Sequence, residues 1–223
     1  MQKEFINVAA HELRTPIQPI LGLADILRSK QNKTNGREEA DYLDVIIRNA
    51  ERLQKLTEDI LDISKIESKL LDLKKESFNL SEMILNAIAD SNNRVAKEPK
   101  GANLKLEFRD PKEDIFIEAD KNRINQVISN LLSNAIKFTD EGTVNITAVP
   151  NTNEIVVSIT DTGPGIDSEI LPRLFTKFAT KSRTGTGLGL FISKSIIDAH
   201  GGNIWGKNNV NGKGATFGFS LPL

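Results

Sequence analysis

A histidine and an acid stand side by side at His11 and Glu12, in a segment whose pattern predicts a helix. A neutral imidazole has one nitrogen free to attack an electrophile at neutral pH, and an adjacent carboxylate can accept the proton from the other nitrogen. Thr15 shares a helical stripe with His11, and Pro16 deprives the Glu12 carbonyl of its usual helical partner. These residues fit nucleophilic chemistry at His11. The alternative is a solvated surface histidine without a chemical role.

A polar stripe lies on another predicted helix, where Asn130, Asn134 and Lys137 occupy positions i, i+4 and i+7. Amide oxygens suit a hard cation such as Mg²⁺ that keeps several of its waters, and a lysine suits phosphate oxygens. The same three residues also fit an exposed polar helix face. The stripe therefore indicates a site for Mg²⁺ and phosphate only if other segments of the chain contribute residues to the same site.

Asp161 follows a strand-like run and begins the sequence Asp-Thr-Gly-Pro-Gly-Ile, which contains Gly163 and Gly165. A carboxylate at a strand end can accept a hydrogen bond from an exocyclic amine, and glycines let the backbone approach a flat ring. An ordinary Asp-Gly turn is the alternative.

The segment Gly185-Thr186-Gly187-Leu188-Gly189 precedes an apolar helix. Backbone N–H groups at a helix N-terminus form an anion site that suits phosphates. Residues 170–197 contain five cations and no acid, which agrees with such a site, although a solvated basic loop fits as well. The chain has no Gly-x-x-x-x-Gly-Lys-[Ser/Thr] motif, so a P-loop is excluded.

The composition narrows the classes of protein. With 223 residues, 39% hydrophobic and 26% charged, the chain is long enough for one large domain or two modest ones. A net charge of −1 excludes the basic footprint of a general nucleic-acid binder, and the absence of cysteine excludes disulfides and thiolate sites. No apolar run reaches the roughly 18–20 residues of a membrane helix. We expect a cytoplasmic segment without membrane contact, which leaves a membrane-anchored parent protein open.

The elements that must position these residues fall into two groups. Residues 2–30 and 38–70 have helical patterns, joined by a polar turn at 31–36. A hairpin of two amphipathic helices cannot enclose a core alone, so we predict a homodimer that forms a four-helix bundle.

Helical and β-like segments then alternate, which predicts an α/β sandwich. The helical segments are 81–98, 121–138 and 187–199. The β-like segments are 104–108, 115–118, 143–149, 154–160, 203–206 and 215–220. The predicted fold is therefore α+β with two domains, 1–72 and 77–223.

The run His-Glu-Leu-Arg-Thr-Pro, residues 11–16, resembles the phosphoacceptor box of the sensor histidine kinases of two-component systems. The resemblance implies that His11 is phosphorylated with Glu12 as its base. It also implies that Glu12 and Thr15 position water for dephosphorylation. Ala10 stands where many members have serine.

The later segments resemble, in order, the N, G1, F and G2 boxes of the Bergerat (GHKL) ATP-binding domain of that family, with 174–178 as the F box. The resemblance implies ATP and Mg²⁺ as cofactors, with Asn134 on Mg²⁺ and with Asn130 and Lys137 near the phosphates. It places Asp161 on the adenine amine, Gly163 and Gly165 beneath the base, and a lid at about 168–186. The remaining residues implied to bind ATP are Lys177, Phe178, Gly185, Gly187, Leu188, Gly189 and Thr216.

We therefore expect an autophosphorylating histidine kinase. ATP would phosphorylate His11, and the phosphoryl group would pass to an aspartate on the receiver domain of a response regulator. Phosphatase activity toward that regulator is a further expectation. Two alternatives stay open. One is a hydrolytic GHKL ATPase, although such enzymes resemble this chain with a glutamate in place of Asn130. The other is a catalytically inactive dimerisation and docking module.

Overall fold

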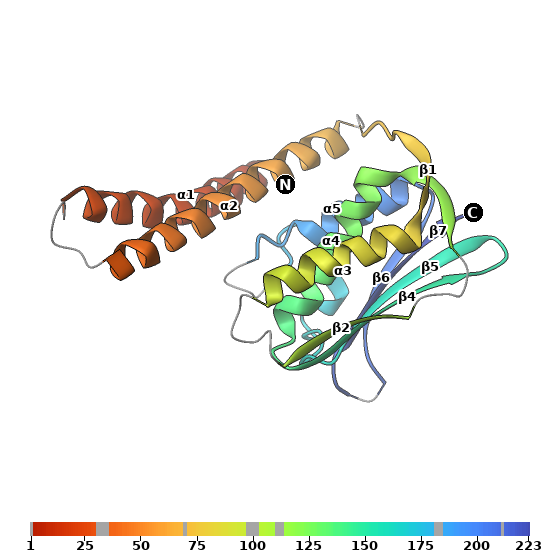
Figure 1. Cartoon of the computed structure of the whole chain (residues 1–223). Coiled ribbons are helices and arrows are strands. Elements are labelled where there is room, and N and C mark those ends of the chain that lie inside the picture. The colour runs from red at the N-terminus through yellow and green to blue at the C-terminus, as the bar shows by residue number, and fades with distance from the viewer. Residues whose placement is uncertain are drawn as a thin grey trace. The chain divides into compact units, whose positions relative to one another are not determined.

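The computed structural model describes residues 2–29, 36–68, 71–96, 103–109, 114–180, 185–210 and 212–223. The chain divides into two compact units, Met1–Leu70 and Leu71–Leu223, which are drawn in Figure 1. Each unit has its own contacts, so each is described by itself. Among the helices that the structure describes, none is long and apolar enough to cross a membrane.

The first unit is a hairpin of two long helices, α1 (Gln2–Ser29) and α2 (Gly36–Glu67). The two helices pack along each other. Both are amphipathic, which is why they pair. The predicted hairpin is confirmed; its turn, apart from Gly36, lies outside the described residues. Pro16 and Pro19 both lie inside α1.

The second unit contains a five-stranded sheet in the order β2-β4-β5-β7-β6. Its strands are β2 (Leu104–Arg109), β4 (Gly142–Pro150), β5 (Glu154–Asp161), β6 (Asn203–Asn208) and β7 (Ala215–Pro222). Strand β2 runs parallel to β4, and the other neighbouring pairs are antiparallel. Burial alternates along β5, where Ile155, Val157, Ile159 and Asp161 are buried. This period of two means that one face of the sheet is covered.

Three helices cover that face: α3 (Leu80–Val95), α4 (Lys121–Phe138) and α5 (Gly189–Ala199) (Figure 1). Helix α4 packs against its neighbours α3 and α5, and α5 contacts β6 and β7. Burying each large aliphatic side chain between helix and sheet contributes roughly 1.5–3 kcal/mol. The predicted α/β sandwich is confirmed. The one short 3-10 helix that the described residues contain is η2 (Leu171–Arg173).

A second, two-stranded sheet joins β1 (Lys75–Asn79) to β3 (Phe116–Asp120). Strand β1 was not predicted, because of its five residues only Phe78 is buried and no alternation marks it. It forms by antiparallel pairing with β3, in which Phe78 lies opposite Ile117. A strand of this kind depends on its partner and not on its own pattern.

Asp120 ties the start of this unit to α4. Its carboxylate accepts hydrogen bonds from the N–H of Lys74 (2.9 Å, Oδ2) and from the N–H of Arg123 (3.1 Å, Oδ1). The second bond caps α4. Burial by itself raises the pKa of Asp120, but these two N–H groups, with the charge of Arg123, outweigh it and hold the pKa below the ordinary 3.8.

His200 occupies the C-cap of α5 and is buried. Its Nε2 accepts a hydrogen bond from the N–H of Asp120 (3.0 Å), so the proton of the neutral ring belongs on Nδ1. That Nδ1 lies 2.8 Å from the carbonyl oxygen of Ile196. Both ring nitrogens are therefore engaged in contacts that hold the fold together.

Candidate active site

His11 projects from α1 with 76% of its side chain exposed. The carboxylate of Glu12 lies beside it, with Oε1 3.6 Å from His11 Nδ1, an ion-pair separation slightly beyond hydrogen-bond length. An acceptor on the Nδ1 side favours the tautomer in which Nδ1 carries the proton and Nε2 keeps its lone pair. The structure therefore places a base next to one ring nitrogen and leaves the rest of the ring exposed. The hydroxyl of Thr15 donates to the His11 carbonyl oxygen at 3.1 Å.

Glu12 has a second neighbour on α2 that sequence reasoning missed. Arg52 Nη2 donates to Glu12 Oε2 at 3.4 Å, and each of the two side chains is 24% exposed. The pairing follows from the hairpin, because Glu12 lies 29 − 12 = 17 residues before the end of α1 and Arg52 lies 52 − 36 = 16 residues after the start of α2. Counting outward from the turn would have found this pair. The carboxylate thus lies between a guanidinium and an imidazole.

The polar stripe on α4 meets the start of α5. Asn130 Nδ2 donates to Ser193 Oγ at 2.9 Å, and Asn130 Oδ1 occupies the place that a Cβ on Gly189 would need. Gly189 therefore lets the two helices approach. Asn134 and Lys137 follow on the same stripe, half-buried, and Lys137 Nζ lies 5.3 Å from the centre of the Phe138 ring. The opposite face of α4 is buried, as its apolar spacing predicts.

The start of α5 carries N–H groups without a side-chain cap. The first helical bond that the structure describes joins Ile192 N to the Leu188 carbonyl oxygen at 3.0 Å, and the N-cap Leu188 makes no side-chain hydrogen bond. The N–H groups of Gly189 to Phe191 precede that bond, and no acid lies in the first turn. Such an end attracts an anion through its N–H groups and the helix dipole.

The middle of the predicted lid contacts the residue that directly follows the lid. Gly187 has φ +68°, and a Cβ on it would lie 2.6 Å from the carbonyl carbon of Phe178, so no other residue fits there. Phe178 itself has φ 60°, a conformation that non-glycine residues adopt at a cost of order 1 kcal/mol or more. Residues 181–184 of the lid lie outside the described residues, and Gly185 is half-buried.

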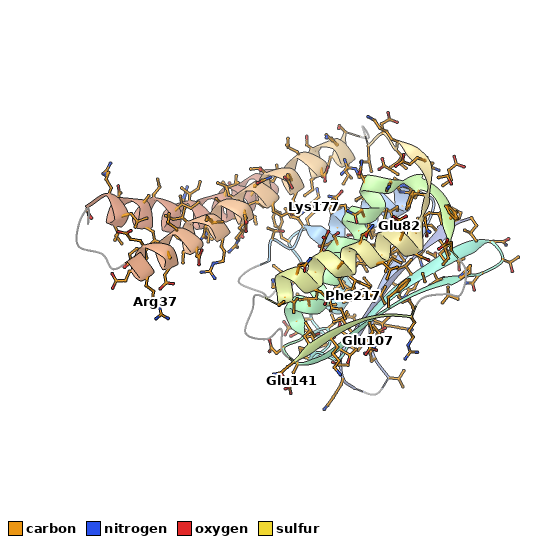
Figure 2. All side chains as sticks on the ribbon, in the orientation of Figure 1. Arg37, Glu82, Glu107, Glu141, Lys177 and Phe217 are labelled. Carbon is orange, nitrogen blue, oxygen red and sulfur yellow. The ribbon has the colours of Figure 1, made fainter. Side chains whose placement is uncertain are left out.

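Lys177 lies in the segment between η2 and α5 (Figure 2). Its Nζ is 5.0 Å from the centre of the Phe191 ring on α5. A cation over an aromatic face gains electrostatic stabilisation. This contact holds a positive charge near the uncapped end of α5, as the basic composition of the segment indicates.

Asp161 is 4% exposed at the end of β5. Its Oδ1 accepts hydrogen bonds from the N–H of Gly163 (2.9 Å) and of Ala215 (3.2 Å). Both of these hydrogen bonds go to Oδ1, so Oδ2 is the carboxylate oxygen that could accept a hydrogen bond from a ligand. Burial raises the pKa of Asp161 above its ordinary 3.8, and the two N–H groups oppose that rise.

The glycines after Asp161 pack against the protein itself. A Cβ on Gly163 would lie 2.6 Å from the carbonyl oxygen of Phe138, and one on Gly165 would lie 2.8 Å from Asn208 Oδ1. Their small size is therefore already required by these contacts. Their placement beneath a purine stays a prediction.

Thr216 lies on the other face of the sheet. It is paired with Thr160, whose neighbour Asp161 points to the helix-covered face, and the two threonine Oγ1 atoms are 3.0 Å apart. The Thr216 hydroxyl donates to Asn209 Oδ1 at 2.7 Å. Its contact with adenine stays a prediction, and the hydrogen bonds favour a supporting role.

The predicted nucleotide residues of the second unit thus form a connected set. Asn130 meets Gly189, Gly187 meets Phe178, and Gly163 meets the end of α4. Among the described residues, no group of three His, Asp or Glu side chains surrounds a metal site. One neutral amide at Asn134 fits Mg²⁺ only as part of a shell completed by phosphate oxygens and water. His11, Glu12 and Thr15 belong to the first unit.

Two family models match the chain. The His Kinase A (phospho-acceptor) domain matches residues 1–69, and the histidine kinase-, DNA gyrase B-, and HSP90-like ATPase matches residues 119–223. Together they include both groups of candidate residues.

Two curated relatives are similar over almost the whole chain. The Non-motile and phage-resistance protein of Caulobacter vibrioides is 38% identical over 100% of this chain and 27% of that protein. The Autoinducer 2 sensor kinase/phosphatase LuxQ of Vibrio harveyi is 34% identical over 99% of this chain and 26% of that protein. The chain thus spans about a quarter of the length of these relatives.

Two solved structures share the fold. Histidine kinase ThkA in complex with response regulator protein TrrA is 33% identical, covers 98% of this chain and 61% of that one, and has a TM-score of 0.75. Full-length ShkA in complex with AMPPNP is 26% identical, covers 99% of this chain and 45% of that one, and has a TM-score of 0.70.

Proposed function

Since the chain belongs to the sensor histidine kinases, with a phosphoacceptor hairpin followed by an ATPase-type domain, we propose that it phosphorylates its own His11 from ATP. The observation that carries the proposal is the exposed imidazole of His11 with the Glu12 carboxylate 3.6 Å from Nδ1. An attacking nitrogen must be reachable, and its other nitrogen needs a proton acceptor. Both conditions are met at one residue.

In the proposed reaction His11 Nε2 attacks the γ-phosphorus of ATP. The bond between that phosphorus and the β–γ bridging oxygen breaks, a P–N bond forms, and ADP leaves. Glu12 takes the Nδ1 proton, so the phosphorylated ring stays neutral. The 3.4 Å hydrogen bond from Arg52 to Oε2 would hold the Glu12 carboxylate beside the His11 ring.

The second unit would bind and orient ATP. We propose that Asp161 Oδ2 accepts a hydrogen bond from the adenine amine, with Gly163 and Gly165 beside the base. The uncapped N-terminus of α5, with Gly185, Gly187, Leu188 and Gly189, would hold the phosphates. Asn130, Lys137, Lys177 and Phe178 would complete this phosphate region, and Thr216 would support the adenine side. Bound Mg²⁺ would neutralise charge on the phosphates, with Asn134 as its protein ligand.

We further propose a homodimer and a response-regulator partner. The hairpin leaves large apolar side chains exposed on both helices: Ile17, Leu21, Ile26, Leu43, Ile47 and Leu61. Apolar surface of this kind is typical of an interface, and a second hairpin would complete a four-helix bundle. The ThkA–TrrA complex supports transfer of the phosphoryl group to an aspartate of a receiver domain. We place this chemistry in the cytoplasm, where ATP is supplied.

A phosphatase activity toward the regulator is the second activity that we propose. The relative LuxQ is named a kinase/phosphatase. Glu12 and Thr15 lie on one stretch of α1, and both could orient water near a phosphorylated aspartate docked at His11.

The test is incubation with γ-labelled ATP and Mg²⁺, followed by acid and alkali treatment of the product. A phosphohistidine is acid-labile and alkali-stable, so the label should show that pattern and be absent from His11→Ala. The variant should still bind ATP, because His11 belongs to the other unit. Label that persists on His11→Ala would overturn the proposal.

A further inference from the structure

Two consecutive asparagines, Asn208 at the end of β6 and Asn209 directly after it, form hydrogen bonds to the loop 161–166 that carries Asp161. Asn208 holds the far end of the loop through two bonds to one residue. Its Oδ1 accepts the N–H of Ile166 at 2.6 Å, and its Nδ2 donates to the Ile166 carbonyl oxygen at 3.0 Å. An amide satisfies both backbone groups of Ile166 as a neighbouring strand would.

Asn209 holds the near end of the same loop. Its Nδ2 donates to the carbonyl oxygens of Asp161 (3.0 Å) and Lys213 (2.9 Å), and its Oδ1 accepts the hydroxyl of Thr216 (2.7 Å). Its backbone N–H donates to the Gly214 carbonyl oxygen at 3.1 Å. Both side-chain N–H groups and the side-chain oxygen are therefore used. An alanine would lose all three side-chain bonds, while an aspartate would set a negative oxygen against two carbonyl oxygens.

The residues between the two ends are packed tightly. Gly214 lies so close to the Asp161 carbonyl that a Cβ would clash there, and Gly165 lies against Asn208. Thr162 Oγ1 accepts the N–H of Thr143 at 3.0 Å. The direction of the Asp161 carboxylate is thus fixed by the loop, and the loop is fixed at both ends from the β6–β7 connection.

We propose that Asn208 and Asn209 are positioning residues that hold the 161–166 loop so that Asp161 reads the amine of the bound purine. This inference rests on the proposed function. The two asparagines act through Asp161 and do not touch the reacting atoms. The loop contacts the base equally before and during phosphoryl transfer, so it contributes uniform binding. Loss of these side-chain hydrogen bonds should therefore raise the Kd for ATP and leave the rate of His11 labelling at saturating ATP unchanged.

The experiment compares Asn209→Ala and Asn208→Ala with the wild-type chain, and Asn203→Ala is the matched control. Asn203 is exposed at the other end of β6, and no side-chain bond is described for it. The Kd is measured for ATP and for inosine triphosphate, which has a carbonyl oxygen where ATP has its amine. The rate of His11 labelling is measured at saturating ATP.

For Asn209→Ala we expect the Kd for ATP to rise about tenfold, since each lost hydrogen bond is worth roughly a factor of two to ten. The Kd for inosine triphosphate should rise less, so the ratio of the two Kd values should become smaller. The rate of His11 labelling at saturating ATP should stay within about twofold of the wild-type rate. Asn208→Ala should show the same pattern with about a threefold rise. Asn203→Ala should match the wild type.

Each result is decisive. An unchanged Kd for ATP in both folded variants would overturn the inference, and so would an equal loss for both nucleotides, because a general loosening of the site moves both. Folding is checked by the fluorescence of Trp205, the one tryptophan of the chain, which lies over Gly218 of β7. Should Asn209→Ala fail to fold, Asn208→Ala decides, because its side chain is exposed. A wild-type chain that binds neither nucleotide would overturn the proposed function as well, whereas normal wild-type binding with unaffected variants overturns this inference alone.

Discussion

The two units present their key side chains in opposite ways. His11 on the hairpin is 76% exposed and has one ionic neighbour in Glu12, whereas Asp161 in the second unit is 4% exposed and held by two backbone N–H groups. An acceptor that must be reached by large partners needs an open surface. A group that recognises a small ligand needs a fixed direction, and buried hydrogen bonds supply it. The difference separates reactivity from recognition along one chain.

The largest effect is expected on the recognition side, from Asn134→Ala. Loss of this proposed metal ligand should reduce Mg²⁺-dependent labelling of His11 on the order of 100-fold or more, because a bound metal contributes several kcal/mol to phosphoryl transfer. The measurement is the initial labelling rate over a series of Mg²⁺ concentrations. Asn125→Ala, an exposed position on the same helix, is the control and should behave as wild type. An unchanged Mg²⁺ dependence would mean that another group holds the metal.

On the reactive side, Glu12→Gln should slow labelling about 100-fold, because a glutamine accepts a hydrogen bond but does not take a proton. The Kd for ATP should stay at its wild-type value, since Glu12 belongs to the hairpin. Single-turnover labelling and nucleotide binding are measured on the same samples. A rise in Kd without a loss of rate would contradict the separation of the two units' roles.

Asp161→Asn should weaken ATP binding by roughly 10- to 100-fold, because hydrogen bonds to charged groups are worth about 1.5–3 kcal/mol. The substitution keeps the size and the Oδ1 acceptor for Gly163 and Ala215, so the loop should hold its shape. Calorimetry of nucleotide binding gives the affinity, and the rate at saturating ATP should fall much less. Wild-type affinity would remove Asp161 from the adenine site.

The smallest effect concerns the pH dependence of stability in the second unit. Burial raises the folded-state pKa of Asp161, so the folded state holds more protons than the unfolded state between 3.8 and that raised value. The free energy of unfolding should therefore fall as the pH rises through this window. Asp161→Asn should remove that fall, which urea unfolding followed by Trp205 fluorescence can measure at several pH values.

Asp120 supplies the internal comparison for that measurement. Its folded-state pKa is lowered, so its contribution is present above 3.8 and is lost as the pH falls through the folded value. Asp120→Asn should thus change the slope in the opposite sense. The same slope change in both variants would contradict the assignment of the two shifts.

The elements with strong periodicity were predictable, and the contacts between them were not. The sequence predicts the helix 121–138 with the bounds that α4 has, because its apolar and polar faces are distinct. The sequence did not predict strand β1, because Phe78 alone among its five residues is buried. A strand defined by its partner leaves no pattern of its own.

The candidate site shows the same division. Residues within one motif, such as His11 with Glu12 or Asp161 with Gly163, could be grouped from their spacing. Asn208 and Asn209 could not, because their partners lie 42 and 48 residues away. Only the fold brings such distant positions together, and an asparagine in a loop carries no sign of the backbone groups that it will bind.

The hydrogen-bonded ring of His200 makes this second histidine unreactive in the folded chain. It is the one histidine besides His11, and its two nitrogens are occupied by Asp120 and Ile196. An imidazole whose lone pair already accepts a hydrogen bond cannot be acylated or phosphorylated unless the contacts of His200 with Asp120 and Ile196 are broken. Any histidine adduct found on the folded chain of these 223 residues is therefore expected at His11, without peptide mapping.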